Sequence, residues 1–174
     1  MERIICLAIG YLFGMFQTSY IIGKIHHMDI RQYGSGNAGT TNALRTLGKK
    51  AGAMTLIGDM LKCVIAILIV DAVFKNRYQE ILPLLGMYTA AGCVLGHNFP
   101  FYLGFRGGKG IAASAGMLLA MDWRVFLICA VIFIGLVAIT RYVSLGSMAA
   151  CRCADLFHWV WRCGKLWHGF PSYI

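Results

Sequence analysis

The sequence predicts an all-α fold, a polytopic integral membrane helical bundle of about five to seven helices, because it is very apolar and its apolar residues gather in long segments. Hydrophobic residues make up 59% of the 174 residues and charged residues only 13%, about half the charged share of a soluble domain. The basic residues, which give a net charge of +9, collect in short stretches between the apolar segments. This pattern is typical of a membrane protein that obeys the positive-inside rule, and it argues against nucleic-acid binding.

The apolar segments define the expected membrane spans. Residues 4–23 contain no charge and match the roughly 20 residues that cross a bilayer as one helix, so we expect a retained first span rather than a cleaved signal peptide. Residues 122–124 predict an interfacial turn between two further apolar segments, at residues 110–121 and 125–140. Gly10 and Gly14 have the small-xxx-small spacing that lets helix backbones approach closely. The further apolar segments cover residues 51–74, 78–95, 110–121 and 125–140.

Two opposite charges lie inside the apolar segment at residues 51–74. Asp59 and Lys62 are three residues apart, so they share one helix face and can partly neutralise each other. Charges at this depth are costly unless they are paired. The pair either only stabilises helix packing or serves the mouth of a site, and the sequence leaves both interpretations open.

The seven cysteines indicate neither a disulfide framework nor a zinc site, because their number is odd and no C-x-x-C spacing occurs. We expect no bound metal and no cofactor. Four cysteines lie inside apolar segments and are interpreted as small buried hydrophobes: Cys6, Cys63, Cys93 and Cys129.

The distribution of basic residues predicts how the chain is oriented. The loop at residues 24–50 holds more basic residues than the amino terminus or the turn near residue 76, so we expect this loop on the cytoplasmic side. Alternating crossings then place residues 96–110 and the segment around Arg141 on that same side. The basic residues of the first loop are Lys24, Arg31, Arg45, Lys49 and Lys50.

The first of these loops is rich in glycines and small polar residues. Glycines allow positive φ and close backbone approach, so consecutive amides can surround an anion, and Arg45 adds a two-pronged cation suited to phosphate. The loop also fits G-x-G-x-x-G, but a membrane span precedes it where a dinucleotide-binding motif needs a strand. The candidate anion-binding residues of this loop are Gly34, Ser35, Gly36, Asn37, Gly39, Thr41, Asn42 and Arg45.

The second loop predicts a further phosphate site, because a glycine-rich turn with a lysine leads directly into a helix. It is not a P-loop, since Gly110 stands where a Ser or Thr must bind magnesium. His97 at its start is a candidate general base or phosphate donor, or alternatively a histidine that caps the loop. The candidate binding residues are Gly107, Gly108, Lys109 and Gly110.

A third polar segment contributes Arg141 and Ser144. Alone, this segment would predict an interfacial anchor. Two anion-binding loops expected on the same side make Arg141 and Ser144 candidates for phosphate binding as well.

Taken in order, these motifs resemble the signatures of the PlsY family of bacterial acyl-phosphate-dependent glycerol 3-phosphate acyltransferases. The resemblance covers roughly residues 4–150 and rests on three ranges. The first signature is matched by residues 34–45 with 59–62, the second by residues 96–110, and the start of the third by residues 140–145.

The resemblance implies a multi-pass enzyme of the bacterial cytoplasmic (inner) membrane that carries out the first step of phospholipid synthesis. Such an enzyme transfers an acyl group from acyl phosphate to the 1-hydroxyl of glycerol 3-phosphate and releases lysophosphatidic acid and phosphate. It implies that Ser35 and Arg45 are needed for activity and that residues 107–110 bind glycerol phosphate and phosphate. The expected partners are these two substrates and membrane lipid, with no protein partner and no nucleic acid.

The residues themselves agree with acyl transfer without a covalent nucleophile. An acyl phosphate is already activated, so the site must hold two phosphate-bearing molecules and stabilise charge on the carbonyl oxygen and leaving phosphate. No G-x-S-x-G elbow occurs, and none of the five histidines has an aspartate at the fifth following position. The proton of the hydroxyl would go to His97 or to a phosphate of a substrate.

The sequence changes character near residue 151, where Cys and Trp become frequent. We expect an acyltransferase domain at residues 1–150 and an atypical tail at residues 151–174, explained by a shifted reading frame or an early end. The rest of the family's third motif is then missing, which makes an inactive truncated remnant one alternative. The other alternative is a non-catalytic phosphate-binding membrane protein or transporter.

Overall fold

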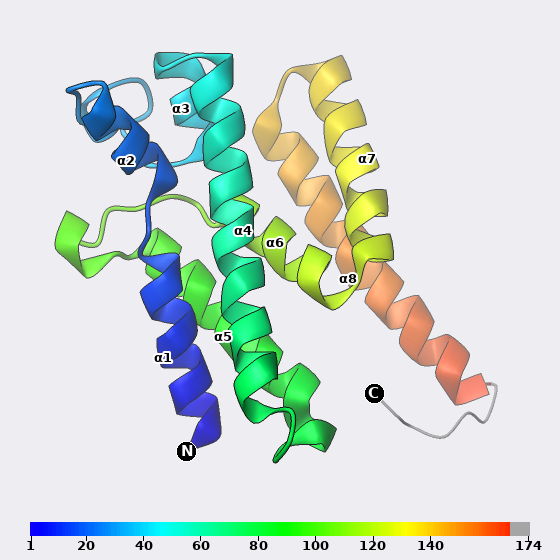
Figure 1. The fold of residues 1–174 in the computed structure, drawn as a ribbon. Helices are drawn as coiled ribbons and strands as arrows, with labels where there is room; N and C mark the ends of the chain where they lie inside the picture. Colours follow the sequence, from blue (N-terminus) through cyan, green and yellow to red (C-terminus); the bar gives the residue numbers. More distant parts are fainter. Residues whose placement is uncertain (168–174) are drawn as a thin grey trace. The chain divides into compact units, whose positions relative to one another are not determined.

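The computed structural model describes residues 1–167, with side chains described to residue 155 (Figure 1). All regular secondary structure in the described residues is helical, which confirms the predicted all-α class. It divides into two compact units, residues 1–121 and residues 122–174. The helices of the first unit are α1 (Glu2–Gly14), α2 (Thr18–Ile25), η1 (Ile30–Gln32), α3 (Thr40–Thr46), α4 (Lys49–Phe74), η2 (Gln79–Ile81), α5 (Leu82–Asn98), η3 (Phe101–Leu103) and α6 (Ile111–Met121). Those of the second are α7 (Trp123–Thr140) and α8 (Val143–Trp167).

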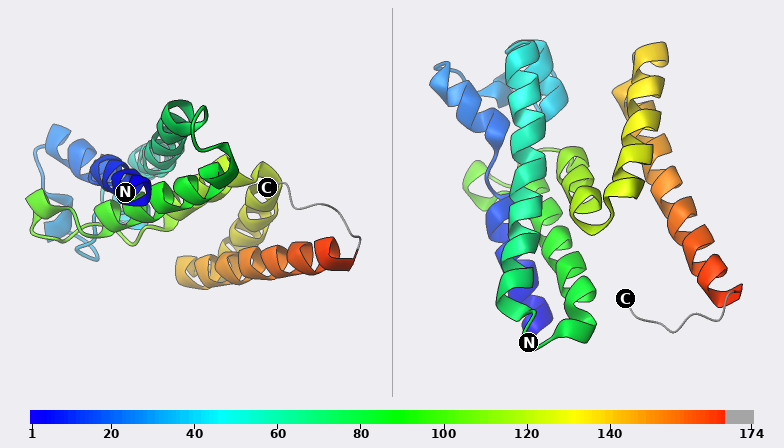
Figure 2. Two further views of the ribbon diagram at one scale, coloured as in Figure 1. Left: turned by 90° about the horizontal axis from the view of Figure 1, so that it is seen from below. Right: turned by 45° about the vertical axis from the view of Figure 1, so that its right-hand side comes forward.

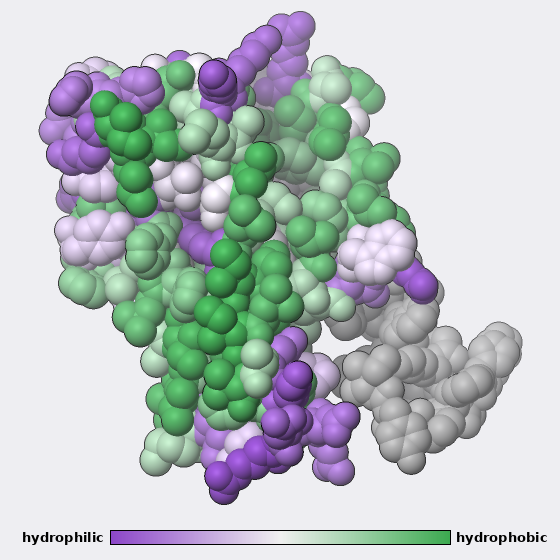
Figure 3. Space-filling model, in the orientation of Figure 1, coloured by the Kyte–Doolittle hydropathy of each residue, from purple (hydrophilic) through white to green (hydrophobic). Residues whose placement is uncertain are grey.

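Three helical stretches within the described residues are long and apolar enough to cross a membrane: Glu2–Ile25, Lys49–Phe74 and Trp123–Thr140. In Figure 3, hydrophobic side chains cover α4 along most of its length, and polar groups collect at its two ends. The exposed lysines Lys49 and Lys50 lie at one end of α4, and Lys75 and Arg77 follow its other end. This division is the one expected of a helix that spans a bilayer.

Helices α1 and α5 touch through their backbones, as the small-xxx-small spacing predicts. A Cβ at Gly10 would overlap the main chain of Thr89, and one at Gly14 would overlap the main chain of Cys93. Gly96 on α5 lies equally close to the main chain of α1. Figure 2 shows α1, α4 and α5 running side by side. This close contact fixes the end of α5, from which the second polar loop starts.

The first span is broken, and in this respect the expectation of one continuous helix over residues 4–23 is wrong. Helix α1 ends at Gly14 and α2 begins at Thr18, with Gln17 in an extended conformation. The broken backbone is satisfied internally, because Tyr102 Oη donates to Met15 O at 2.7 Å and Lys62 Nζ donates to Phe16 O at 2.6 Å. Irregular backbone at membrane depth requires such internal partners.

Helices α4, α5 and α6 pack around a small apolar core that includes Cys63, Cys93 and Ala113. Cys6 and Cys129 are also buried, so all four cysteines of the apolar segments are buried as predicted. A Cβ at Gly116 would overlap the backbone of α4, and this close contact positions α6. The middle of α6 is therefore held against the middle of α4, at Met60.

The second unit is a helical pair. Asp122 caps α7 by accepting from the Arg124 backbone N–H at 2.9 Å, which confirms the turn predicted at residues 122–124. Gly146 of α8 packs against Phe133 of α7. Helix α8 continues without a break across residues 150 and 151, where the sequence composition changes. The last residues of the expected tail, 168–174, lie outside the described residues.

Candidate active site

The first polar loop folds through glycines with positive φ. Gly34 has φ 60° and Gly36 has φ 70°, which side chains other than glycine rarely adopt. Ser35 lies between them and is exposed. Helix α3 begins at Thr40, directly after the loop. The loop therefore turns twice within a few residues and presents Ser35 at its surface.

Asn42 holds this loop together from inside. Its Oδ1 accepts from the Ser35 N–H at 2.9 Å, and its Nδ2 donates to Ile30 O and Tyr33 O, both at 3.0 Å. The side chain is only 2% exposed. These contacts use its donors and an acceptor within the loop, so the geometry favours a role in folding the loop over direct contact with a substrate.

Arg45 lies in the last turn of α3 and is exposed, without an ion pair to any residue that the structure describes. Asn37, Gly39 and Thr41 are partly buried. A Cβ at Gly39 would lie 3.0 Å from Asn37 Oδ1 and 4.0 Å from Gly108 Cα. The middle of the first loop thus lies directly beside the second loop.

The second loop is folded back onto the end of α5. The Gly107 N–H donates to Asn98 O at 3.1 Å and the Gly108 N–H donates to His97 O at 3.0 Å. A Cβ at Gly107 would overlap His97 O, and one at Gly108 would overlap His97 Nε2. Both positions therefore require glycine. Gly110 has φ 75°, and α6 begins at the next residue, so Lys109 is exposed at a helix start as predicted.

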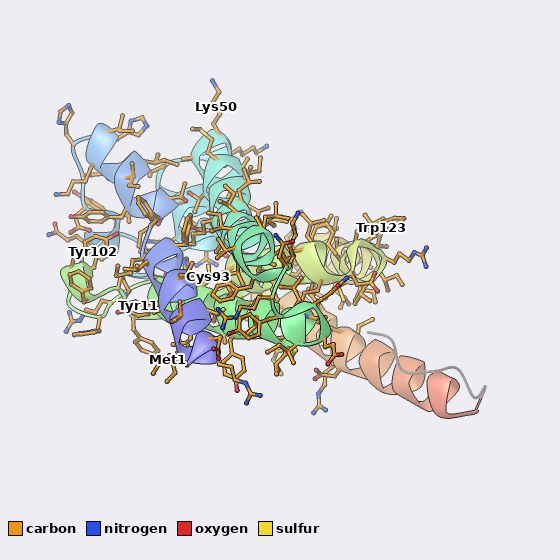
Figure 4. The ribbon with its side chains drawn as sticks, turned by 60° about the horizontal axis from the view of Figure 1, so that its bottom comes forward. Met1, Tyr11, Lys50, Cys93, Tyr102 and Trp123 are labelled. Atoms are coloured by element: carbon orange, nitrogen blue, oxygen red, sulfur yellow. The ribbon has the colours of Figure 1, made fainter. Side chains whose placement is uncertain are left out.

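The two loops are joined by direct contacts. The Ala38 N–H donates to Gly107 O at 3.3 Å, and Arg31 Nη1 donates to Leu103 O at 2.9 Å. Two tyrosines, both labelled in Figure 4, form further hydrogen bonds between the first span and the chain after α5. Tyr11 Oη donates to Phe99 O at 2.8 Å, and Tyr102 Oη donates to Met15 O at the break in the first span. The two predicted anion loops are thus in direct contact with each other.

A cavity of about 500 Å³ opens between these loops. Asp29 and Arg31 form an ion pair there, with Arg31 Nη2 2.7 Å from Asp29 Oδ2, and this hydrogen bond from Arg31 lowers the pKa of Asp29. The cavity was missed in the sequence, where Arg31 counted only as a basic loop residue. Its lining residues are Asp29, Arg31, Gln32, Gly36, Leu103, Gly104 and Arg106.

His97 is buried behind the second loop rather than open to it. It is 2% exposed, and its Nδ1 lies 2.8 Å from Lys62 Nζ. Lys62 also binds Asp59, with Nζ 2.9 Å from Oδ1. An ammonium group can only donate, so Nδ1 acts as acceptor and the imidazole is neutral with its proton on Nε2. Neither ring nitrogen then offers a free lone pair to a substrate.

Arg141 and Ser144 belong to the second unit. Arg141 ends α7 with φ 60°, and its N–H donates to Val137 O at 2.9 Å. Both side chains are exposed, and Ser144 lies in the first turn of α8. Within this unit they lie at one end of the helical pair.

Helices suited to a bilayer define an integral membrane protein. Its two linked glycine loops expose three cations of a kind suited to phosphate: Arg45, Arg106 and Lys109. The sequence profile of the glycerol-3-phosphate acyltransferase family matches residues 4–173. The chain therefore belongs to this family, as the motifs predict, and is a membrane acyltransferase.

Individual relatives agree with this assignment. The glycerol-3-phosphate acyltransferase of Clostridioides difficile (strain 630) is 53% identical over 156 residues, which cover 88% of this chain and 76% of that protein. The glycerol-3-phosphate acyltransferase of Lactiplantibacillus plantarum is 46% identical over 153 residues, which cover 86% of this chain and 70% of that protein. The crystal structure of PlsY in its glycerol 3-phosphate form matches with a TM-score of 0.78 at 36% identity, covering 92% of this chain and 78% of that one. The crystal structure of the lysophosphatidic acid form of PlsY matches with a TM-score of 0.76 at 35% identity.

The family match also bears on the carboxy-terminal tail. It extends past residue 150 to residue 173, and α8 runs continuously through the same region as far as Trp167. The shifted reading frame expected near residue 150 stays a prediction, which sequencing of the coding region would test.

Proposed function

We propose that the chain transfers an acyl group from an acyl phosphate to the 1-hydroxyl of glycerol 3-phosphate at the inner face of a bacterial cytoplasmic membrane. The single observation that carries this proposal is the bond between the two glycine loops, Ala38 N–H to Gly107 O at 3.3 Å. Because each loop is suited to one phosphate group, joined loops would bind two phosphate-bearing molecules side by side. Relatives with the same family name and a PlsY structure in a glycerol 3-phosphate form support the acceptor.

In this proposal the first loop acts on the reacting phosphate. Ser35 and Arg45 are exposed at its surface, and Gly34 and Gly36 bend the backbone on either side of Ser35. Arg45 would pair with phosphate oxygens, and the Ser35 hydroxyl would donate to the carbonyl oxygen or the phosphate as charge develops. Asn37, Gly39 and Thr41 line the same loop, with Asn42 as its internal support.

The second loop would bind the other phosphate. Lys109 and Gly110 stand at the start of α6, where unpaired amides and the helix dipole favour an anion. Gly107 and Gly108 allow the backbone to lie close to His97. Arg141 and Ser144 lie in the second unit, and phosphate binding by these two residues stays a prediction from the sequence.

The chemistry needs no covalent enzyme intermediate. The 1-hydroxyl oxygen attacks the acyl carbon, the bond between that carbon and the phosphate oxygen breaks, and inorganic phosphate leaves with the electron pair. The hydroxyl proton passes to a phosphate oxygen of a substrate, because the ring nitrogens of His97 have no lone pair available. Positioning and charge stabilisation supply the catalysis.

The test is an acyl-transfer assay with the full chain in membranes, using palmitoyl phosphate and labelled glycerol 3-phosphate. Lysophosphatidic acid and phosphate should form in equal amounts, and palmitoyl-coenzyme A should not replace palmitoyl phosphate. Ser35→Ala and Arg45→Ala should each lower turnover by at least about 100-fold, the usual loss when a group that stabilises the transition state is removed. Arg77→Ala, an exposed arginine in the turn after α4, is the matched control.

Binding of glycerol 3-phosphate without any ester product would instead identify a carrier or binding protein. Product formation that survives Ser35→Ala and Arg45→Ala would refute the assignment of the first loop.

A further inference from the structure

Lys62 of α4 is buried and fully satisfied, although it lies in the middle of a membrane-spanning helix. Its ammonium group has three N–H donors and three acceptors: Phe16 O at 2.6 Å, Asp59 Oδ1 at 2.9 Å and His97 Nδ1 at 2.8 Å. These acceptors come from the broken first span, from α4 itself and from α5. A pair that only neutralised two charges would not need acceptors on three separate segments.

His97 connects this network to the second loop on two sides. Its main-chain oxygen accepts from the Gly108 N–H at 3.0 Å and from Gln17 Nε2 at 2.7 Å. The Nε2 edge of its ring lies against Gly108, where a Cβ would overlap it. Lys62 fixes the opposite edge of the ring through Nδ1. The position of Gly108 therefore depends on where Lys62 holds the imidazole.

Asp59 sets the position of Lys62 in turn. Its Oδ1 accepts from Lys62 and from Thr18 Oγ1 at 3.0 Å, and the carboxylate is 1% exposed. Thr18 is the first residue of α2, so the carboxylate also fixes the helix that follows the break. The network thus joins α2, α4 and α5 directly behind the two loops.

We propose that Asp59, Lys62 and His97 are positioning residues that hold the second glycine loop against the first. None of the three reaches the substrate. Lys62 keeps His97 neutral, with Nδ1 as acceptor, and so fixes the ring against which Gly108 packs. Gly108 carries Gly107, whose oxygen accepts from Ala38 of the first loop. This inference rests on the proposed function for its kinetic readout.

The experiment must separate positioning from simple charge pairing. Lys62→Met alone leaves Asp59 as an uncompensated buried charge, and this variant can fail to fold. The double variant Asp59→Asn with Lys62→Met removes both charges and keeps similar volumes, so the fold should remain. It still lacks the donors to His97 Nδ1 and to Phe16 O, and positioning should be lost.

We expect the double variant to accumulate in membranes and to melt within a few degrees of the wild type. Its kcat/KM for glycerol 3-phosphate should fall by roughly 100-fold, because small displacements of a positioning loop have losses of this order. Gly108→Ala, which displaces the same loop, should add little to the loss when combined with the double variant. Asp71→Asn, an acidic residue further along α4, should leave kcat/KM unchanged.

A second readout does not require activity. Hydrogen exchange of the segment at residues 96–110 should become faster in the double variant, while exchange in the first half of α1 stays at the wild-type rate. If wild-type protein forms no product, the proposed function fails, yet the exchange result still tests the network. A double variant with wild-type kcat/KM and unchanged exchange at residues 96–110 would overturn the inference and leave the charges a packing role only.

Discussion

Asn42 Oδ1 lies 2.9 Å from the main-chain nitrogen of Ser35 and accepts its N–H, across seven residues of the first glycine loop. The same side chain donates twice to earlier backbone carbonyls. The conformation that exposes Ser35 is therefore stabilised by a buried side-chain amide.

Replacing Asn42 by alanine should disrupt this loop. Ile30 O, Tyr33 O and the Ser35 N–H would lose their partner, at a cost of about 1–3 kcal/mol for each group that stays buried. We expect a lower melting temperature and strongly reduced acyl transfer, measured on protein purified in detergent. Asn76→Ala, at an exposed position after α4, is the control and should change neither. An Asn42→Ala protein with normal turnover would show that the loop does not depend on this amide.

The contact between α1 and α5 should not tolerate side chains. A leucine at Gly14 would overlap the main chain of Cys93 and force the helices apart. We expect Gly14→Leu to destabilise the protein by about 1–3 kcal/mol or more, the usual range for overpacking. Gly135→Leu is a matched control within a helix, because a Cβ there meets no described atom within 4 Å. Thermal unfolding in detergent compares the two, and equal melting temperatures would contradict the close contact.

The ion pair between Asp29 and Arg31 should give a specific acid sensitivity. Because Arg31 lowers the pKa of the folded Asp29 carboxyl, the stabilisation is present above the unfolded pKa of about 3.9 and is lost as pH falls through the lower folded value. The melting temperature should therefore decrease when the pH is lowered past about 4. Asp29→Asn should remove this part of the pH dependence. The same acid slope in both proteins would exclude Asp29 as its source.

The orientation of α4 can be tested by thiol labelling. In a background with serine in place of the cysteines after residue 150, Asn76→Cys should react with a membrane-impermeant maleimide in intact cells. Lys50→Cys should react only after the cells are opened, because the positive-inside rule places the first loop in the cytoplasm. Labelling of Lys50→Cys in intact cells would reverse the proposed orientation.

Local patterns predicted much of this structure from sequence. Glycines in polar loops indicated positive φ, which Gly34, Gly36 and Gly110 adopt. The spacing of Gly10 and Gly14 indicated the close helix contact, and long apolar segments indicated α4 and α7. These features depend on neighbouring residues, so periodicity and residue type suffice to find them.

What the sequence did not predict depends on contacts between distant residues. The break in the first span is stabilised by Lys62 and Tyr102, which lie far along the chain from Phe16 and Met15. The only local signal was a short polar run that begins at Gln17. Similarly, nothing near His97 in sequence reveals that its Nδ1 is taken by Lys62, a residue 35 positions earlier.

The backbone contact between α1 and α5 has a consequence for how the surrounding lipid acts on the enzyme. The contact extends to Gly96, the residue before His97, so a change in the spacing of these two helices moves the support of the second loop. Lipids that alter lateral pressure on the helices would thereby change turnover without binding to either glycine loop. Bilayer composition would act as a regulator of the enzyme that begins to build it.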